Sequence, residues 1–329
     1  MLRGWFVARL IDVIYNLRMR ENDFLSWIAA QTPPHAQVPV NIGDDMAAVR
    51  LGAGEGQLAL LKIDQCLDQV HFDLRHHTPA QAGRKAVNRC LSDCAAMACL
   101  PAALLISVAL PREGPGSGEA AAKELFLACR EAGAAFDCPL VGGDTAIWDQ
   151  RLAVTVAALG VLPAGGREIR RGGAKVGDTL FVSGQLGGSI KGRHLTFVPR
   201  IQLAQKLAQA AGRALHALMD LSDGLAQDLP RMCAASGVGA EVHAGRLPIH
   251  ADAAALSAED GIPAGLHALA DGEDYELLFA LEPQATPQIV NLSDVPLTAI
   301  GTITQGDLKL IDAGGAVHDW PRAGWEHHG

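Results

Sequence analysis

Carboxylates stand beside glycine, or within apolar segments, at several separated places in this 329-residue sequence. They are Asp45, Asp64, Asp93, Asp144, Asp220, Asp223 and Glu273. Several carboxylates can share one pocket only where cations neutralise them. Oxygen ligands without Cys or His favour Mg²⁺ over zinc, and protein-bound Mg²⁺ commonly joins carboxylates to substrate phosphates. The pattern predicts a magnesium-dependent enzyme that acts on a phosphate.

Asp93 is the carboxylate with the most informative surroundings. It lies within residues 86–97, which are small and apolar nearly all round and predict a buried helix. A buried carboxylate is costly unless a cation meets it. Arg89, one turn earlier, offers an i,i+4 ion pair, and a metal ion offers the alternative. For Asp93 taken alone, the ion pair with Arg89 is favoured over the metal ion.

Familiar phosphate-binding motifs are missing from the sequence. It contains neither a Gly-x-x-x-x-Gly-Lys-Ser/Thr loop nor the protein-kinase motif set. The glycine-rich segment 184–192 indicates either a phosphate loop or a plain surface loop. Gly142 and Gly143, directly before Asp144, are a better signal, because two glycines let backbone N–H groups approach a phosphate closely.

Composition narrows the class of partner. The formal net charge is −9, and no run of Lys or Arg indicates binding to nucleic acid or to an anionic membrane. Seven cysteines without a C-x-x-C pair predict reduced thiols and a cytoplasmic protein. Residues 1–18 are expected to form an amphipathic extension of uncertain role, since they lack a clean signal-peptide core.

Helical and strand patterns alternate along the chain and predict an α/β (α+β) fold. Before residue 163 we expect strands at 38–42, 58–63, 103–110 and 152–161, and helices at 21–31, 78–100 and 118–132. Pro163-Ala164-Gly165-Gly166 is the best linker. The expected domains are therefore residues 19–163 and 167–329, and the second is again mixed, with strands at 179–183, 217–220, 240–243, 275–281, 297–303 and 308–311.

The ordered motifs resemble the thiamine-monophosphate kinase family, which belongs to an ATP-binding superfamily with aminoimidazole-ribonucleotide synthetase. The matching segments are Ile42–Asp45, Asp64 with Val70–Phe72, Lys85–Met97, Gly142–Thr145, Gly173–Asp178, Asp220–Leu225 and Gly272–Leu277. The resemblance implies an N-terminal sheet that joins its copy in a homodimer, a C-terminal α/β domain, and a nucleotide in the cleft between the domains.

The resemblance also implies the reaction, in which ATP phosphorylates thiamine monophosphate to thiamine diphosphate by direct in-line transfer with several Mg²⁺ ions. The residues that it places at the site fall into three groups. The metal ligands would be Asp45, Asp64, Asp93, Asp144, Asp220 and Asp223; the ATP contacts Gly143, Asp144, Arg171 and Ser222; and the thiamine contacts His71, Glu273 and Trp325.

One departure from the family pattern bears on the metal site. The two positions before Asp64, where the family usually has hydroxyl residues that help to bind metal, hold Lys62 and Ile63. Lys62 places a cation where a magnesium ion would sit. This leaves two alternatives to the kinase: a sister activity of the superfamily on another phosphorylated small molecule, or a non-catalytic protein that binds nucleotide or thiamine phosphate.

Overall fold

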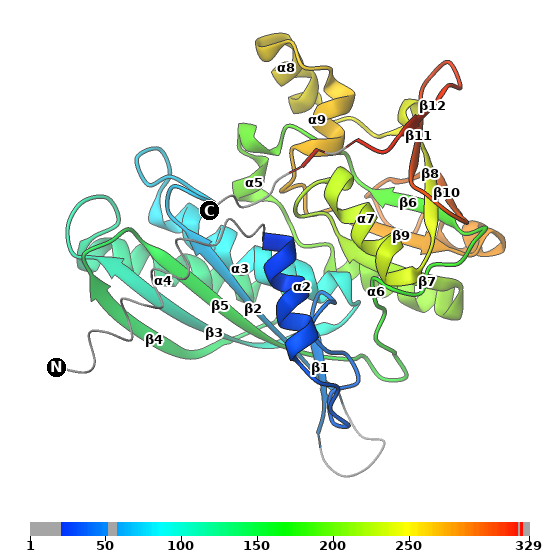
Figure 1. Cartoon of the computed structure of the whole chain (residues 1–329). Coiled ribbons are helices and arrows are strands. Elements are labelled where there is room, and N and C mark those ends of the chain that lie inside the picture. The colour runs from blue at the N-terminus through cyan, green and yellow to red at the C-terminus, as the bar shows by residue number, and fades with distance from the viewer. Residues whose placement is uncertain (1–20, 52–57, 322, 325–329) are drawn as a thin grey trace.

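The computed structural model describes residues 21–51, 58–321 and 323–324. Within these residues, the N-terminal half forms a five-stranded sheet with the order β1-β2-β5-β3-β4 (Figure 1). Its strands are β1 (Ala47–Arg50), β2 (Leu58–Leu67), β3 (Leu100–Pro111), β4 (Leu140–Trp148) and β5 (Ala153–Val161). Among the described strands of this sheet, only β3 and β4 pair in parallel.

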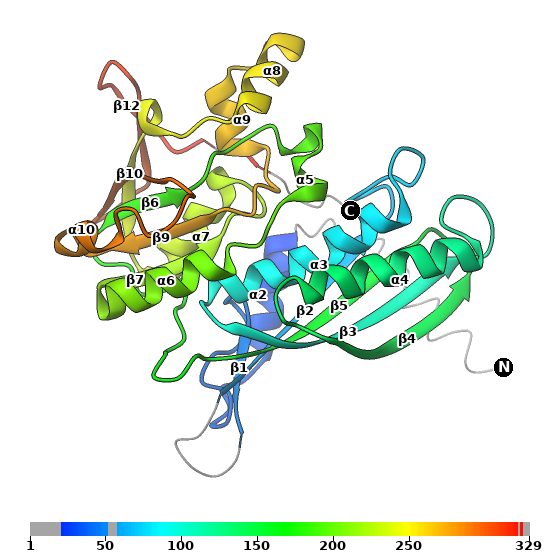
Figure 2. The same cartoon turned by 180° about the vertical axis from the view of Figure 1, so that it is seen from behind.

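Two long helices, α3 (Pro79–Ala96) and α4 (Gly118–Ala134), cover one face of this sheet, as Figure 2 shows from behind. Helix α3 begins where the sequence predicts. Thr78 accepts a hydrogen bond from the Gln81 N–H, the Gln81 side chain caps the Thr78 N–H in return, and Pro79 occupies the first turn. A shorter helix, α2 (Glu21–Gln31), precedes the sheet.

The C-terminal half forms a seven-stranded sheet with the order β12-β11-β8-β10-β6-β9-β7. Its strands are β6 (Thr179–Ser183), β7 (Leu215–Asp220), β8 (Gly239–His243), β9 (Leu277–Leu281), β10 (Leu297–Thr304), β11 (Lys309–Ile311) and β12 (Val317–Asp319). Its helices are α5 (Arg193–Thr196), α6 (Ile201–Ala211), α7 (Leu225–Ser236), α8 (Ala251–Asp260), α9 (Ala264–Ala270) and α10 (Thr286–Ile289). Short 3₁₀ helices cover Ser189–Lys191, Gly212–Ala214, Ala244–Arg246 and Pro283–Ala285.

Helix α3 contacts both halves of the molecule. It packs on β2 and β5 of the first sheet and on α5, α6 and β7 of the second half. One apolar cluster runs from Leu91 on this helix to Leu218 and Phe279, on one face of the second sheet. Met219 and Leu278, their neighbours on those strands, point to the other face and into a separate core. The buried middle of α3 is thus held between the two sheets.

The structure confirms a mixed α/β fold and corrects part of the element prediction. The strand expected at 38–42 is wrong: Val40 and Ile42 form only isolated bridges, and Pro39 in that segment has no N–H for a ladder. The prediction for residues 1–18 lies outside the described residues. Among the described residues, no helix is both long and apolar enough to cross a membrane.

Candidate active site

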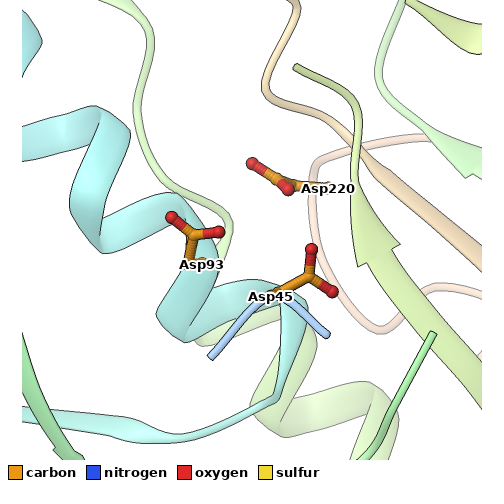
Figure 3. A group of neighbouring side chains, drawn as sticks. All are labelled: Asp45, Asp93 and Asp220. Atoms are coloured by element: carbon orange, nitrogen blue, oxygen red, sulfur yellow. The ribbon is translucent and has the colours of Figure 1, made fainter. Parts of the chain in front are cut away.

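Three carboxylates from distant parts of the chain meet between the two halves (Figure 3). Asp45 precedes β1, Asp93 lies on α3, and Asp220 ends β7. One oxygen from each lies within 4.8 Å of the other two, and all three residues are buried. Figure 3 shows the three side chains gathered around a common space. Three buried anions this close together need cations.

Lys62 on β2 supplies the cation for Asp93. Its Nζ lies 2.9 Å from Asp93 Oδ1. The ion pair between Arg89 and Asp93 that the helical spacing offered is therefore not formed. Arg89 pairs instead with Asp64, with 3.3 Å between Nε and Oδ2. A partner from the neighbouring strand replaces the one expected from the same helix.

The other two carboxylates have different partners. The Arg171 guanidinium pairs with Asp45 through Oδ1, and Ser92 Oγ donates a 2.6 Å hydrogen bond to Asp220 Oδ2. Asp45 Oδ2 is buried and has no hydrogen-bond partner within the described part of the chain. A buried carboxylate oxygen without a donor is costly, so it marks a position where a cation fits.

The electrostatics of the cluster follow from burial and charge. Burial, with a contribution from Asp45, raises the pKa of Asp220 to about 6. Burial alone would lower the pKa of Lys62, but the negative charges of Asp93 and Asp64 outweigh it and raise that pKa above its ordinary value. The cluster therefore favours positive charge in its centre.

Two adjoining cavities lie at this cluster. The smaller, of about 120 Å³, is lined by Asp45, Asp93 and Asp220 among others. The larger, of about 470 Å³, shares Arg89, Ser222 and Tyr275 with it and extends to the residues His71, Asp223 and Glu273. The structure thus brings the predicted thiamine contacts His71 and Glu273 next to the carboxylate cluster.

Lys85, on α3, lies fully buried behind the larger cavity. Its Nζ lies 2.7 Å from Glu273 Oε1 and also donates to the His71 carbonyl oxygen. Burial lowers the pKa of Lys85 although the Glu273 charge opposes that shift. One ammonium therefore holds both segments that carry predicted substrate contacts.

The backbone around Glu273 is strained. Glu273 and Tyr275 have φ angles of 53° and 50°, a backbone region that residues other than glycine rarely adopt. The Glu273 N–H donates to the Ser222 carbonyl oxygen at 2.7 Å, and the Tyr275 N–H to that of Leu221 at 2.8 Å. The segment is thus tied to the loop that follows Asp220, which couples the larger cavity to the carboxylates.

Gly143 and Asp144 are not brought into the cluster within one chain. They lie inside β4, where Asp144 pairs with Ser107, Ser107 with Thr155, and Thr155 with Gln65 on β2. Three strand spacings separate Asp144 from Gln65, which is about 14 Å. Both residues line another cavity, of about 300 Å³, between β4 and α4.

Two further predicted residues, Asp223 and Ile63, are not part of the cluster of three carboxylates. Asp223 pairs with Arg231 and faces the larger cavity. Ile63 is 69% exposed, because it points to the opposite face of β2 from Lys62, so its side chain contributes nothing to the cluster. Trp325 lies outside the described residues.

The glycine-rich segment 184–192 is neither a phosphate loop nor a plain surface loop. The Gly187 N–H donates to Asp274 and the Gly188 N–H to Asp271, at 3.0 and 2.7 Å. Both glycines are buried. The chain's own carboxylates occupy these amides.

Sequence reasoning assigned no role to Ser92 or Lys85. Ser92 directly precedes Asp93, and Lys85 lies two turns before it, so both belong to the helix already singled out. A polar residue on a helix that is otherwise buried all round is the signal that would have found them.

Comparison with known proteins defines the class. Residues 43–162 match the family model for the N-terminal domain of AIR synthase related proteins, and residues 164–312 match the model for the C-terminal domain. The two models divide the chain between the two sheets. The chain therefore belongs to the AIR synthase related family.

Relatives in sequence place the chain within that class. It is 37% identical over 290 residues to a thiamine-monophosphate kinase of Rhodopirellula baltica, and the match covers 86% of this chain and 89% of the relative. It is 31% identical to that of Bacillus subtilis, over 87% of this chain and 92% of the relative. The chain belongs to the thiamine-monophosphate kinase family.

Solved structures agree with this assignment. The structure described as AaThiL complexed with AMPPCP and TMP is similar with a TM-score of 0.79 and 26% identity, over 94% of this chain and 97% of the other. The thiamine-monophosphate kinase of Stenotrophomonas maltophilia has a TM-score of 0.68 and 29% identity, over 88% of this chain and 96% of the other.

Proposed function

We propose that this protein transfers the γ-phosphoryl group of ATP to thiamine monophosphate. A phosphate oxygen of thiamine monophosphate attacks the γ-phosphorus, the bond from that phosphorus to the bridging oxygen of ADP breaks, and thiamine diphosphate and ADP are released. The observation that carries the proposal is the cluster of Asp45, Asp93 and Asp220 beside the cavity that His71 and Glu273 line. The relatives of this chain in sequence are thiamine-monophosphate kinases.

The carboxylate cluster fits Mg²⁺. Its donors are all carboxylate oxygens, and Asp45 Oδ2 is buried without a partner in the described chain. Asp45, Asp93 and Asp220 would hold the ion. Bound Mg²⁺ supplies neutralisation of the phosphate charge that develops during transfer.

The remaining residues bind and orient the two substrates. Arg171 and Ser222, which line the smaller cavity, would contact the ATP phosphates. Glu273, held by Lys85, offers a carboxylate to the cationic thiazolium ring, and His71 lies on the same wall. Asp64 holds Arg89, which lines both cavities. Positioning of this kind is most of what phosphoryl transfer asks of a protein.

Gly143 and Asp144 act on the nucleotide of a second copy in a homodimer. Such a shared site would reconcile their predicted roles with their distance from the cluster within one chain. They lie on β4, an edge strand whose residues from Val141 to Trp148 are exposed, including the apolar side chains of Val141, Ile147 and Trp148. An exposed apolar edge strand is a surface that invites a second sheet.

Mixing two inactive variants tests the shared site. If Asp144 acts across the dimer, Asp144→Asn and Asp220→Asn chains together form mixed dimers in which one site carries both native residues. Activity should then reappear on mixing. A mixture as inactive as its components would contradict the shared site.

Substrate identity is tested by phosphorus NMR of purified protein with ATP and Mg²⁺. We expect thiamine monophosphate to yield thiamine diphosphate and ADP in equal amounts, and thiamine alone to yield none. Calorimetric binding of thiamine monophosphate without turnover would favour the non-catalytic binding protein. The ion pair of Lys62 with Asp93 in the cluster is the observation on that side. No binding would favour a sister activity.

The free, buried thiols of all seven cysteines support a cytoplasmic location.

A further inference from the structure

Lys62 is built into the carboxylate cluster by the sheet. It lies in the middle of β2, where it pairs with Ala158 of β5, and its neighbour Leu61 pairs with Ala47 of β1. A strand hydrogen-bonded on both sides fixes the direction of its side chains. Its ammonium is anchored 2.9 Å from Asp93 Oδ1 and lines the smaller cavity.

The charges around this ammonium are nearly balanced by the chain itself. Five carboxylates line the smaller cavity: Asp45, Asp64, Asp93, Asp220 and Asp228. Four cations of the same lining pair with four of them: Lys62 with Asp93, Arg89 with Asp64, Arg171 with Asp45 and Arg231 with Asp228. Within the described residues, Asp220 has the Ser92 hydroxyl and no ion pair. One net negative charge remains, which one divalent cation more than neutralises before any phosphate arrives.

We propose that the Lys62 ammonium is a permanent cation that replaces one divalent ion beside Asp93. With Mg²⁺ bound at the proposed site, on which this step rests, the cluster binds one divalent ion fewer than the same carboxylates would bind without Lys62. The ammonium occupies Asp93 Oδ1 and leaves the other Asp93 oxygen, with Asp45 and Asp220, for the ion that remains. Nucleotide binding then depends less steeply on the concentration of free Mg²⁺.

Replacing Lys62 with methionine removes the charge and keeps most of the length of the side chain. Asp93 then keeps a buried charge without its cation, which is strongly unfavourable unless another cation enters. A divalent ion supplied in solution is that cation. The variant should therefore bind an additional ion, whereas Lys62→Arg, which keeps a cation on the same strand, should not.

Counting bound Mn²⁺ by electron paramagnetic resonance tests this without turnover. Protein saturated with the ATP analogue AMPPCP is titrated with Mn²⁺, and the free ion is measured. We expect Lys62→Met and Lys62→Gln to bind one Mn²⁺ more per chain than the unsubstituted protein. The control Lys309→Met removes a 2.7 Å ion pair with Asp319 on exposed strands and should leave the count unchanged.

An equal count in the unsubstituted protein and both neutral variants, folded by circular dichroism, would overturn the role of Lys62 while leaving the metal site standing. A higher count that Lys62→Arg also shows would overturn it too, because the charge would then not be responsible. If Asp220→Asn binds as many ions as the unsubstituted protein, the carboxylate site itself is contradicted, and the inference falls with it.

Discussion

Ser92 Oγ donates a 2.6 Å hydrogen bond to Asp220 Oδ2, and this bond joins the two halves of the molecule at the candidate metal site. Ser92 lies on α3, which packs on the first sheet, and Asp220 ends a strand of the second. Both side chains are buried. The bond orients a carboxylate that forms no ion pair with the described residues, so it sets the position of one proposed Mg²⁺ ligand.

Ser92→Ala should therefore weaken metal binding. Loss of a partner that orients a metal ligand typically costs about 10- to 100-fold in metal affinity or activity. We expect the Mg²⁺ concentration for half-maximal activity to rise by about this factor. Ser117→Ala, which removes an exposed 2.7 Å bond to the Gly114 carbonyl, is the matched control. Equal Mg²⁺ dependence in the two variants would contradict the role of Ser92.

Lys85→Met should act on one substrate only. The variant frees the Glu273 carboxylate and the His71 carbonyl, which Lys85 holds together at the larger cavity. We expect KM for thiamine monophosphate to rise about tenfold or more, the effect of about 1.4 kcal/mol, with little change in KM for ATP. Lys123→Met breaks an exposed pair with Glu119 and controls for loss of a lysine. Equal rises in both KM values would show general damage instead.

Gly143→Ala should disrupt the edge of the first sheet, whereas Gly142→Ala should be mild. A Cβ at Gly143 would lie 1.8 Å from the Ile106 carbonyl oxygen, but one at Gly142 would first meet the Leu105 side chain at 3.3 Å. Overpacking typically costs about 1–3 kcal/mol. Urea denaturation should place the two variants in that order. Equal stability would mean that Gly143 serves the nucleotide alone.

Protonation of His267 should stabilise the fold at low pH. Burial alone would lower the pKa of His267, but the hydrogen bonds and charges of Asp271 and Asp260 raise it above the ordinary 6.5. A raised pKa in the folded state stabilises fully below the unfolded value and no longer once the pH has passed the folded value. His267→Gln should thus lose more unfolding free energy at pH 5.5 than at pH 9.

His77 provides the opposite case, and both histidines can be measured by urea denaturation at the same two pH values. Burial, aided by Lys85, lowers the pKa of His77, so the folded state resists its protonation. The free energy of unfolding of His77→Gln, compared with that of the unsubstituted protein at the same pH, should be higher at pH 5.5 than at pH 9. The same sign for both variants would contradict the environments described.

The sequence was informative where local chemistry sufficed. A carboxylate at a strand end or in an apolar helix is unusual enough to be noticed, and Asp45, Asp93 and Asp220 do meet. The start of α3 was predictable because its capping residues are adjacent in sequence. Patterns of this kind depend on neighbours within one turn or one strand.

Partners from other elements could not be predicted in the same way. Lys62 lies 31 residues from Asp93, and only the packing of β2 against α3 brings them together. Helical spacing favoured Arg89, because it describes one helix and not the strand beside it. The separation of Asp144 from the cluster follows from the order of the strands, which the residues alone did not reveal.

The most direct test of the proposed reaction is to measure by chromatography how much thiamine diphosphate forms from ATP and thiamine monophosphate over a range of Mg²⁺ concentrations. We expect the amount of product to rise with Mg²⁺ in the unsubstituted protein and activity to fall at least about a hundredfold in Asp220→Asn, since a metal ligand is removed. Asp149→Asn, on an exposed loop, should retain full activity. Equal activity in Asp220→Asn would contradict the carboxylate centre, and no product from the unsubstituted protein would contradict the proposed reaction.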